Sequence, residues 1–322
     1  MKVKIPILLI VNDRPYILPE VLSRIMKYTD WDNFELWILE NYASKSVKKI
    51  IGAFKRKYPF INVYEQNFNQ ISVIQNEIIS KLKREIYIKL DDDIFVTENW
   101  TKGFVNVINR HIDDVSIGSV VIPINGFSWK IFLEVMGLKA EFKRKFPNIE
   151  IIQGCTEPAV WSDSEVAKFI WEYSLPMEDV SKQFIEKVGA KIEDFVVPYR
   201  YSIGAISFTH DLWERMGGWK VDEKFAKKKK VYDFLLGLNN HIAKLRKKKE
   251  QRRTKNIVDI ILGMDISALG IEEEYVFNFS NKENLKQYVT NESIVFHFSF
   301  FPTEGEIVNN YLFKITSIPK SI

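Results

Sequence analysis

The feature that most constrains the fold is a regular alternation of strand-like and helix-like patterns over the first 125 residues. Short apolar runs typical of buried strands lie at residues 4–11, 34–39, 61–64, 85–90 and 116–122. Segments with apolar positions at helical spacing lie between them, at residues 16–28, 47–58 and 71–82. This order is typical of βαβ units, so we expect an α/β fold: a mostly parallel sheet flanked by helices.

The rest of the chain is less regular. Residues 126–200 are rich in Trp, Phe and Glu, with helical patterns at 127–145 and 163–188, and we expect them to form a helical insertion or cap. Strand-like runs return at 201–208 and 293–300. The sequence therefore predicts three parts, at residues 1–125, 126–200 and 201–322.

Composition excludes several classes of protein. With 46% hydrophobic and 14% aromatic residues, the chain is not a disordered tail or a fibre. The single cysteine, Cys155, allows no intrachain disulfide, which favours a cytoplasmic location. The apolar run 5–11 is too short to cross a bilayer, and no signal peptide is expected.

Polar residues follow three of the expected strands at the point where each one ends. They are Asn12-Asp13, Glu40-Asn41 and Asp91-Asp92-Asp93. Ligands of open parallel sheets bind outside the carboxyl ends of the strands. These three groups are therefore expected at one rim, and they predict a binding site there.

The acidic triplet is the strongest of these signals. Adjacent carboxylates repel one another unless a cation holds them, and oxygen ligands suit Mg²⁺ and Mn²⁺. On extended backbone Asp91 and Asp93 share a face, and Asp92 faces away. The alternative is a solvated acidic turn. In its βαβ context the triplet indicates a metal that bridges the protein to a diphosphate.

Several pieces in this order resemble the family-2 glycosyltransferases of the GT-A fold. They include "IPILLIVNDRP", "FELWILEN", "NVYEQNFNQISVIQNEII", "YIKLDDDIFVTENW", "SIGAISFTHDLWERMGGW", "GIEEEYVF" and "IVFHF". The resemblance implies a nucleotide-sugar donor, a Mn²⁺ or Mg²⁺ ion and inverting transfer of a hexosyl or pentosyl group. A UDP-sugar is the expected donor, although the residues after Glu40 differ from the family pattern that accompanies uridine.

The resemblance also implies roles for individual residues. Asp91, Asp93 and His297 would hold the metal, and Gly217, Gly218 and Trp219 would line the acceptor side. His297 has a rival interpretation as a buried core histidine in an apolar strand. The residues that would contact the donor are Asp13, Glu40, Asn41, Asn67, Asn69, Asp91 and Asp92.

Inverting transfer needs a carboxylate that takes a proton from the acceptor hydroxyl. The run Glu272-Glu273-Glu274 stands where the family has a Glu-Asp pair. The alternative interpretation is that the run is an ordinary acidic start of a helix without a catalytic role. We favour Glu273 as the base, with Asp265 as a fallback.

A basic insertion spans residues 224–255. It holds thirteen Lys/Arg and two acidic residues, a net charge of +11, so the rest of the chain carries −7 of the overall +4. The segment could be a solvated loop, could contact an anionic membrane surface, or could hold nucleic acid.

Three functional alternatives therefore stay open beside the metal-dependent inverting transferase. One is a DNA-modifying glycosyltransferase that holds nucleic acid through the basic segment. If its target were duplex DNA, the target base would have to be flipped out of the helix. Another is a nucleotidyltransferase of related fold, for which the loop 12–15 lacks the expected glycines. The third is a non-catalytic protein that binds nucleic acid or a membrane.

Overall fold

The computed structural model describes residues 3–66, 69–124, 127–151, 159–221 and 271–298. Its strands are β1 (Ile5–Val11), β2 (Phe34–Asn41), β3 (Asn62–Gln66), β4 (Ile86–Asp91), β5 (Ile94–Phe95), β6 (Val115–Val121), β7 (Asp194–Val197), β8 (Ala205–Thr209), β9 (Lys286–Ile294) and β10 (Phe296–His297). Its helices are α1 (Leu18–Tyr28), α2 (Lys45–Lys57), α3 (Ile71–Leu82), α4 (Trp100–Arg110), α5 (Trp129–Met136), α6 (Lys139–Lys145), α7 (Ala159–Ser162), α8 (Ser164–Glu172), α9 (Met177–Val188), α10 (His210–Arg215) and α13 (Ile271–Lys282).

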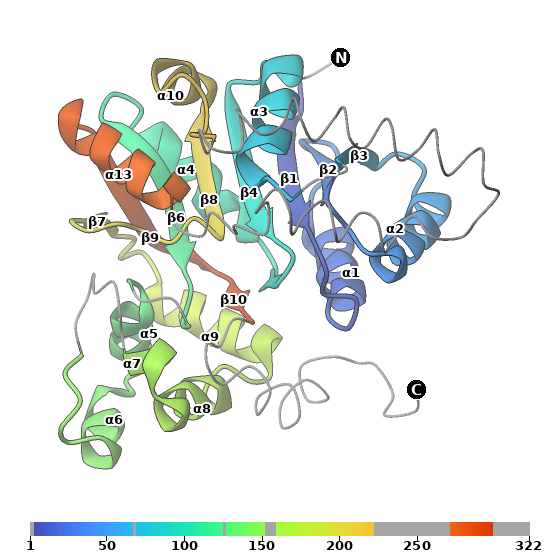
Figure 1. Cartoon of the computed structure of the whole chain (residues 1–322). Coiled ribbons are helices and arrows are strands. Elements are labelled where there is room, and N and C mark those ends of the chain that lie inside the picture. Colours follow the sequence, from blue (N-terminus) through green and yellow to red (C-terminus); the bar gives the residue numbers. More distant parts are fainter. Residues whose placement is uncertain (1–2, 67–68, 125–126, 152–158, 222–270, 299–322) are drawn as a thin grey trace, which may run out of the picture.

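One large sheet organises these elements. Its eight strands lie in the order β3-β2-β1-β4-β8-β6-β9-β7, which Figure 1 shows running across the molecule. The strands β1 to β4 are parallel to one another, and β6 is parallel to β9. Only β8 and β7 pair antiparallel with their neighbours in this sheet. The prediction of a mostly parallel α/β sheet flanked by helices is confirmed.

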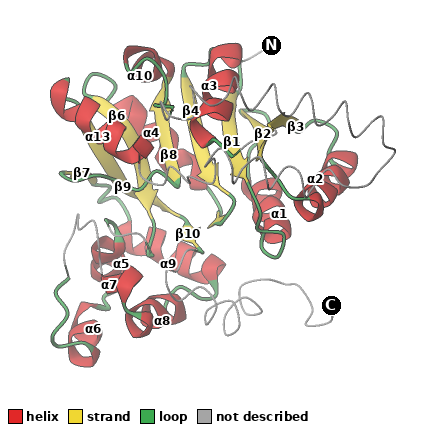
Figure 2. Cartoon of the chain, viewed as in Figure 1, coloured by secondary structure: helices red, strands yellow, loops and turns green. Residues whose placement is uncertain are grey.

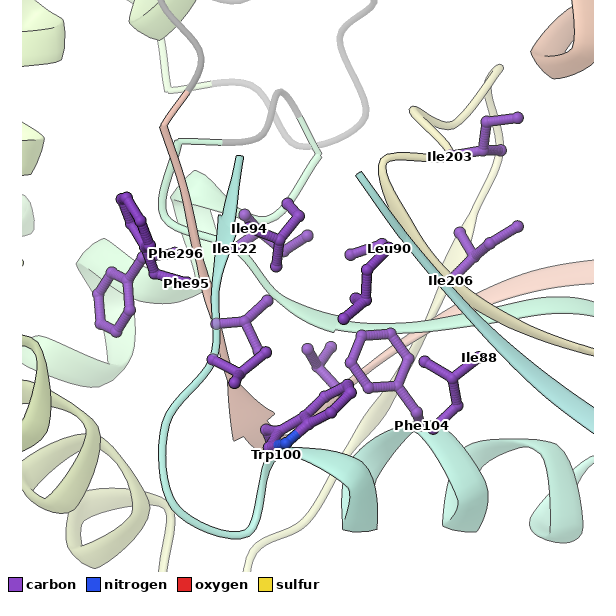
Figure 3. Packing of buried hydrophobic residues seen from close by; sticks show 14 of the residues in the cluster. Ile88, Leu90, Ile94, Phe95, Trp100, Phe104, Ile122, Ile203, Ile206 and Phe296 are labelled. Atoms are coloured by element: carbon purple, nitrogen blue, oxygen red, sulfur yellow. The ribbon is translucent and has the colours of Figure 1, made fainter. Parts of the chain in front are cut away.

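The sheet is held by the apolar runs from which it was predicted. In β1 every residue from Pro6 to Val11 is buried, as expected for a strand covered on both faces. Next to β4 and β5, the side chains of Ile88, Leu90, Trp100 and Phe104 form a continuous packed layer (Figure 3). Burial of this kind provides the main free energy that holds the rim in place.

The helices α5 to α9 gather as a separate group beside the sheet (Figure 2). Their own aromatic contacts include Phe142, whose ring centroid lies 5.4 Å from that of Trp129 and 5.5 Å from that of Phe169. Helices are therefore present in the expected region, but they are short rather than the two long stretches predicted. Its last part, β7, joins the main sheet beside β9.

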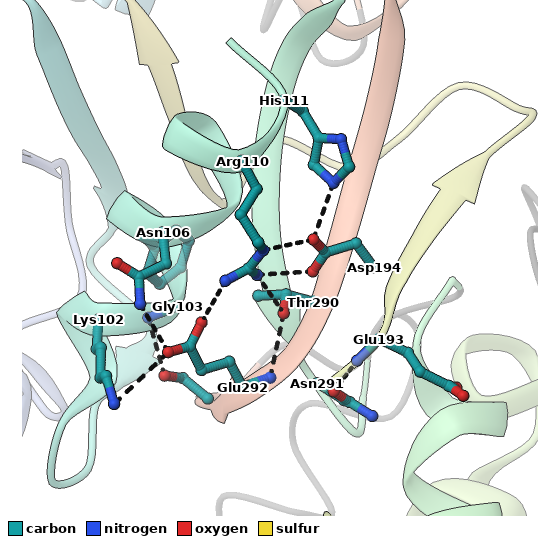
Figure 4. A network of polar contacts seen from close by, with 12 residues as sticks. Lys102, Gly103, Asn106, Arg110, His111, Glu193, Asp194, Thr290, Asn291 and Glu292 are labelled. Atoms are coloured by element: carbon teal, nitrogen blue, oxygen red, sulfur yellow. Dashed lines mark hydrogen bonds and ion pairs between the residues drawn. The ribbon is translucent and has the colours of Figure 1, made fainter. Parts of the chain in front are cut away.

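A polar network fixes β7 to the sheet (Figure 4). Two nitrogens of Arg110, at the end of α4, each lie 2.7 Å from a carboxylate oxygen of Asp194. Arg110 also donates to Glu292 at 2.8 Å, and His111 Nε2 lies 2.8 Å from Asp194 Oδ2. Because these contacts join α4, β7 and β9, the end of the insertion is tied to the core.

Two predicted strands begin at other residues in the structure. The last long strand covers Lys286–Ile294 rather than 293–300, and a two-residue strand, β10, follows it. The run 201–208 becomes a strand only at Ala205. No helix among the described residues is long and apolar enough to cross a bilayer.

Candidate functional site

The predicted polar groups meet at one rim because their strands are neighbours. In the register of the sheet, Val11 of β1 lies opposite Glu40 of β2, and Ile10 lies opposite Asp91 of β4. Glu40 and Asp91 therefore flank the carboxyl end of β1. This is the place where open parallel sheets bind their ligands.

The acidic triplet turns as it leaves β4. Asp92 accepts a hydrogen bond from the backbone N–H of Asn12 at 3.0 Å, and its other oxygen lies 3.4 Å from Arg14 Nη1. Arg14 also pairs with Asp93. The expectation that Asp92 faces away from Asp93 is wrong, because the strand ends at Asp91 and a turn brings both carboxylates toward the loop after β1.

The environment separates the two carboxylates electrostatically. Burial raises the pKa of Asp92 to about 7, and the neighbouring charge of Asp93 adds to this effect. Asp93 is also buried, but the contacts of its carboxylate with His297 and Arg14 outweigh burial and lower its pKa to about 2. Asp93 is therefore ionised at neutral pH.

His297 reaches Asp93 through a short strand pairing. β10 pairs antiparallel with β5, and the backbone N–H of Phe298 donates to the carbonyl of Asp93 at 2.8 Å. This places His297 Nε2 3.2 Å from Asp93 Oδ1. The two atoms are close but not aligned as a hydrogen bond, and Asp93 Oδ1 accepts none from the described residues.

Asp91 has a different partner. Its Oδ1 accepts a hydrogen bond from Lys89 Nζ at 2.6 Å, and Lys89 also donates to the carbonyl of Ile203 at 2.7 Å. Burial raises the pKa of Asp91, while the positive charge of Lys89 opposes that rise. A third of the Asp91 side chain is exposed (33%), so the carboxylate borders the rim rather than the core.

The three glutamates at the start of α13 lie in different environments. Glu272 is buried and accepts a hydrogen bond from Ser72 on α3. Glu273 is partly exposed, accepts from the backbone N–H of Ile203 at 3.3 Å and lies 3.7 Å from Arg200. Glu274 is exposed. Burial raises the pKa of both Glu272 and Glu273, which suits a group that must accept a proton.

Glu40 and Asn41 differ in the number of partners that their side chains have within the protein. Glu40 is buried, burial raises its pKa, and Lys48 lies 4.0 Å away. The Asn41 side chain donates to Asn69 at 2.8 Å and accepts from Gln66 and from the Gln70 backbone, both at 2.9 Å. Asn41 thus shapes the turn after β3 from within.

Of the other expected donor contacts, Asp13 is exposed in the loop after β1. Asn67 lies outside the described residues, as do Asp265 and the basic segment 224–255. The donor role of Asp13 stays a prediction.

The turn expected on the acceptor side is held by α3. Asn76 donates to the carbonyl of Trp219 at 2.8 Å and accepts from the backbone N–H of the same residue at 2.8 Å. Gly217 and Gly218 both have positive φ, +74° and +85°. The Trp219 side chain is buried against Phe208. An acceptor-lining role for this turn stays a prediction.

The fit of a divalent cation depends on the donor atoms that the rim offers. No group of three or more His, Cys, Asp or Glu residues in the described ranges is arranged as a metal site. The donor types nevertheless fit, since a buried carboxylate oxygen of Asp93 without a hydrogen bond faces an imidazole nitrogen at 3.2 Å. Asp91, two residues before Asp93 at the end of β4, would complete the set.

Three positions at this site were not anticipated. Arg14 and Lys89 provide the cations of the acidic triplet, and Gly204 lies against Asp91. A signal existed for Lys89, because a lysine within the apolar run "YIKLDDD" must find a buried partner. Arg14 had none, since a charged residue in a loop is ordinary.

Comparison with known proteins agrees with this geometry. Residues 7–158 match the family described as Glycosyl transferase family 2. Over this segment the chain is similar to the family-2 glycosyltransferases, and the mostly parallel sheet flanked by helices fits their GT-A fold. The resemblance stated from the sequence is thereby confirmed. Comparison with the curated proteins finds no match.

Among solved structures, the chain is similar to S. aureus TarS, residues 1–349. That structure has 15% identity and a TM-score of 0.32, and the match covers 37% of this chain and 35% of TarS. The TarS complex with UDP-GlcNAc gives 14% identity, a TM-score of 0.31 and coverages of 37% and 34%. The TarS complex with UDP has 15% identity and a TM-score of 0.32, and the match covers 37% of this chain and 35% of TarS. The chain thus spans about a third of the length of these structures.

Proposed function

We propose that this protein transfers a hexosyl or pentosyl group from a nucleotide sugar, a UDP-sugar, to an acceptor hydroxyl with inversion. The observation that carries this proposal is the position of Glu40, Asp91 and Asp93 at one rim, at the carboxyl ends of the strands on either side of β1 and within the segment that matches the family. Such a rim suits a nucleoside on one side and a diphosphate on the other.

The donor half is assigned from what each strand end offers. Glu40, with Asp13 in the neighbouring loop, would contact the nucleoside. Asn41 and Asn69 would shape that pocket through their mutual hydrogen bond, and Asn67 is expected beside them. Asp92 would act less directly, by fixing the backbone of Asn12 at the edge of the pocket.

We propose that Asp91, Asp93 and His297 hold a Mn²⁺ or Mg²⁺ ion. When bound, such an ion offsets the negative charge that develops on the leaving diphosphate. The chain prepares the site for it, since Asp93 is ionised at neutral pH and Arg14 holds its second oxygen.

Glu273 is our choice for the base. It would accept the proton of the acceptor hydroxyl while the hydroxyl oxygen forms the new glycosidic bond and the bond to the diphosphate breaks. Glu272 is occupied by Ser72, and Glu274 is exposed, so Glu273 alone combines partial burial with access. Gly217, Gly218 and Trp219 would then support the acceptor side.

The location and partners complete the proposal. We place the enzyme in the cytoplasm, peripheral to a membrane if residues 224–255 contact an anionic membrane surface. The same basic segment could instead hold nucleic acid. The parts 1–125, 126–200 and 201–322 would serve as the nucleotide-sugar half, a cap and the acceptor half.

A melting-temperature screen of nucleotide sugars, each with Mn²⁺ and with a chelator, tests the donor assignment. A ligand present at 100 times its Kd stabilises the folded state by about 2.7 kcal/mol, a measurable shift. We expect a UDP-sugar to raise the melting temperature more with Mn²⁺ than without it. The absence of any shift across all nucleotide sugars would contradict the proposal.

A further inference from the structure

A lysine lies inside the buried strand that leads to the acidic triplet. Lys89 has Ile88 and Leu90 as neighbours, both without exposed surface, and Lys89 itself is 2% exposed. An ammonium group in such surroundings costs several kcal/mol unless it is paired and hydrogen-bonded. The contacts of Lys89 must therefore offset the free-energy cost of burying its ammonium group in β4.

Those contacts join two separate parts of the rim. Alternate residues of a strand point to the same side, so Lys89 and Asp91 share a face of β4. Lys89 Nζ donates to Asp91 Oδ1 at 2.6 Å and to the carbonyl of Ile203 at 2.7 Å. The backbone N–H of Asp91 donates in turn to the carbonyl of Gly204 at 2.8 Å. Lys89 thus clamps the end of β4 to the segment that enters β8.

The second oxygen of Asp91 lies on the other side of its carboxylate. A Cβ at Gly204 would lie 3.2 Å from Asp91 Oδ2 and 3.8 Å from His297 Cε1. The absence of a side chain at 204 therefore keeps open the space beside Oδ2, on the side of His297. With Oδ1 held by Lys89, Asp91 offers Oδ2 in a fixed direction.

Lys89 also acts on the glutamates across the rim. Burial raises the pKa of Asp91, Glu272 and Glu273, and the positive charge of Lys89 opposes that rise at all three. Three carboxylates near one another would otherwise repel, and they would repel an anionic donor as well.

We propose that Lys89 is a positioning residue, which acts through Asp91. It occupies Oδ1 of that carboxylate, so that Oδ2 is the oxygen that would be left to hold a cation bound with the donor. The donor part of this inference rests on the proposed function. The clamp between Lys89 and Asp91 does not, and it can be tested without a ligand.

The test is a double-mutant cycle of Lys89→Met, Asp91→Asn and the double variant. Lys102→Met serves as the control, because Lys102 is exposed and only 3.7 Å from Glu292. Without ligand, we expect Lys89→Met to lower the melting temperature by about 5 °C, because it leaves Asp91 unpaired. The double variant, with neither charge, should recover about half of that loss and remain folded.

The second readout is UDP affinity measured by calorimetry over a MnCl₂ series. Lys89→Met should raise the Mn²⁺ concentration for half-maximal binding by about tenfold, but it should add nothing to Asp91→Asn. Additive losses of melting temperature would overturn the clamp. An unchanged Mn²⁺ requirement in Lys89→Met would overturn the positioning role.

A wild-type protein that binds no UDP at any Mn²⁺ concentration gives a different result. It contradicts the proposed function and, with it, the donor role of Lys89. The melting-temperature cycle still decides in that case whether the clamp exists.

Discussion

Nε2 of His297 lies 3.2 Å from Oδ1 of Asp93, although the two residues are far apart in the sequence. The pairing of β10 with β5 brings them together, and both side chains are buried. A histidine in an apolar strand is commonly a core residue. His297 is buried and also borders Asp93, a carboxylate whose pKa is lowered to about 2 by the contacts with His297 and Arg14 despite its burial.

This contact predicts the effect of His297→Ala. If His297 is a metal ligand, its loss should weaken Mn²⁺-dependent UDP binding by at least about tenfold, measured by calorimetry. His210→Ala is the matched control, because His210 is a partly buried histidine that contacts Glu214 at 3.2 Å on α10. Equal UDP affinity in the two variants would assign His297 to the core alone.

Glu273→Gln tests the base. The amide keeps the size of the side chain but cannot take a proton, so turnover should fall by about 10²- to 10⁴-fold. UDP affinity should stay near that of the wild type. Glu274→Gln, one residue further along and exposed, should keep its activity. The reverse ranking of the two variants would move the base to Glu274.

The same residue sets the acid side of the pH profile. Burial raises the pKa of Glu273 above its ordinary value of 4.5. The base works only when deprotonated, so turnover should fall as the pH decreases through this raised pKa. A rate that stays constant well below pH 4.5 would exclude Glu273 as the base.

Gly218→Ala should destabilise the protein more than Gly217→Ala. Both residues have positive φ, and each alanine costs about 1 kcal/mol or more for that reason. Only at 218 would the new Cβ also lie 3.0 Å from Asn76 Oδ1, whereas nothing lies within 4 Å at 217. We expect a loss of about 2 kcal/mol at 218, measured by urea unfolding. Equal losses of stability in the two variants would show that the Asn76 side chain moves to accommodate the new Cβ.

Asp194→Asn should remove pH-dependent stability. Burial alone would raise the pKa of Asp194, but hydrogen bonds from Arg110, Thr290 and His111 lower it overall. A lowered pKa contributes stability above the unfolded value, near 3.8, and that stability disappears as the pH falls through the folded pKa. We expect a loss of about 2 kcal/mol at pH 7 that shrinks below about pH 4.

The measurement is urea unfolding as a function of pH. Asp211→Asn is the control, since this side chain is 76% exposed and lies 3.6 Å from Arg215. It should change stability by less than about 1 kcal/mol at every pH. A pH-independent loss in Asp194→Asn would mean that the carboxylate charge contributes nothing.

The features of this site that could be predicted are those set by local sequence patterns. Contacts between residues far apart in the sequence could not be predicted. The placement of Glu40 and Asp91 at one rim, on the two sides of β1, followed from the sequence because the order of the apolar runs indicates a parallel sheet. The strand β9 begins earlier than the apolar pattern predicts because its second half carries the buried polar residues Thr290, Asn291 and Ser293. Their partners on other elements satisfy them, and a hydrophobicity pattern cannot show those partners.

Contacts between distant segments were beyond prediction for the same reason. β10 and β5 have two residues each, too few for any periodic pattern. Arg14 is an ordinary loop residue until its partners are known, and the apolar run around Lys89 signals a buried partner without identifying it. The backbone at Asp92 is a turn rather than the extended strand expected, because the sequence marks the end of a strand poorly. Among the glutamates, only the placement of α13 against Ser72 and Ile203 distinguishes Glu272 from Glu273.

The most direct test of the central claim is the release of UDP from a UDP-sugar by the wild type and by Asp93→Asn. This substitution keeps the shape of the side chain and removes its charge. We predict Mn²⁺-dependent release by the wild type and a loss of at least about 10³-fold in the folded variant. Undiminished release by Asp93→Asn would contradict the assignment of the acidic triplet to the donor.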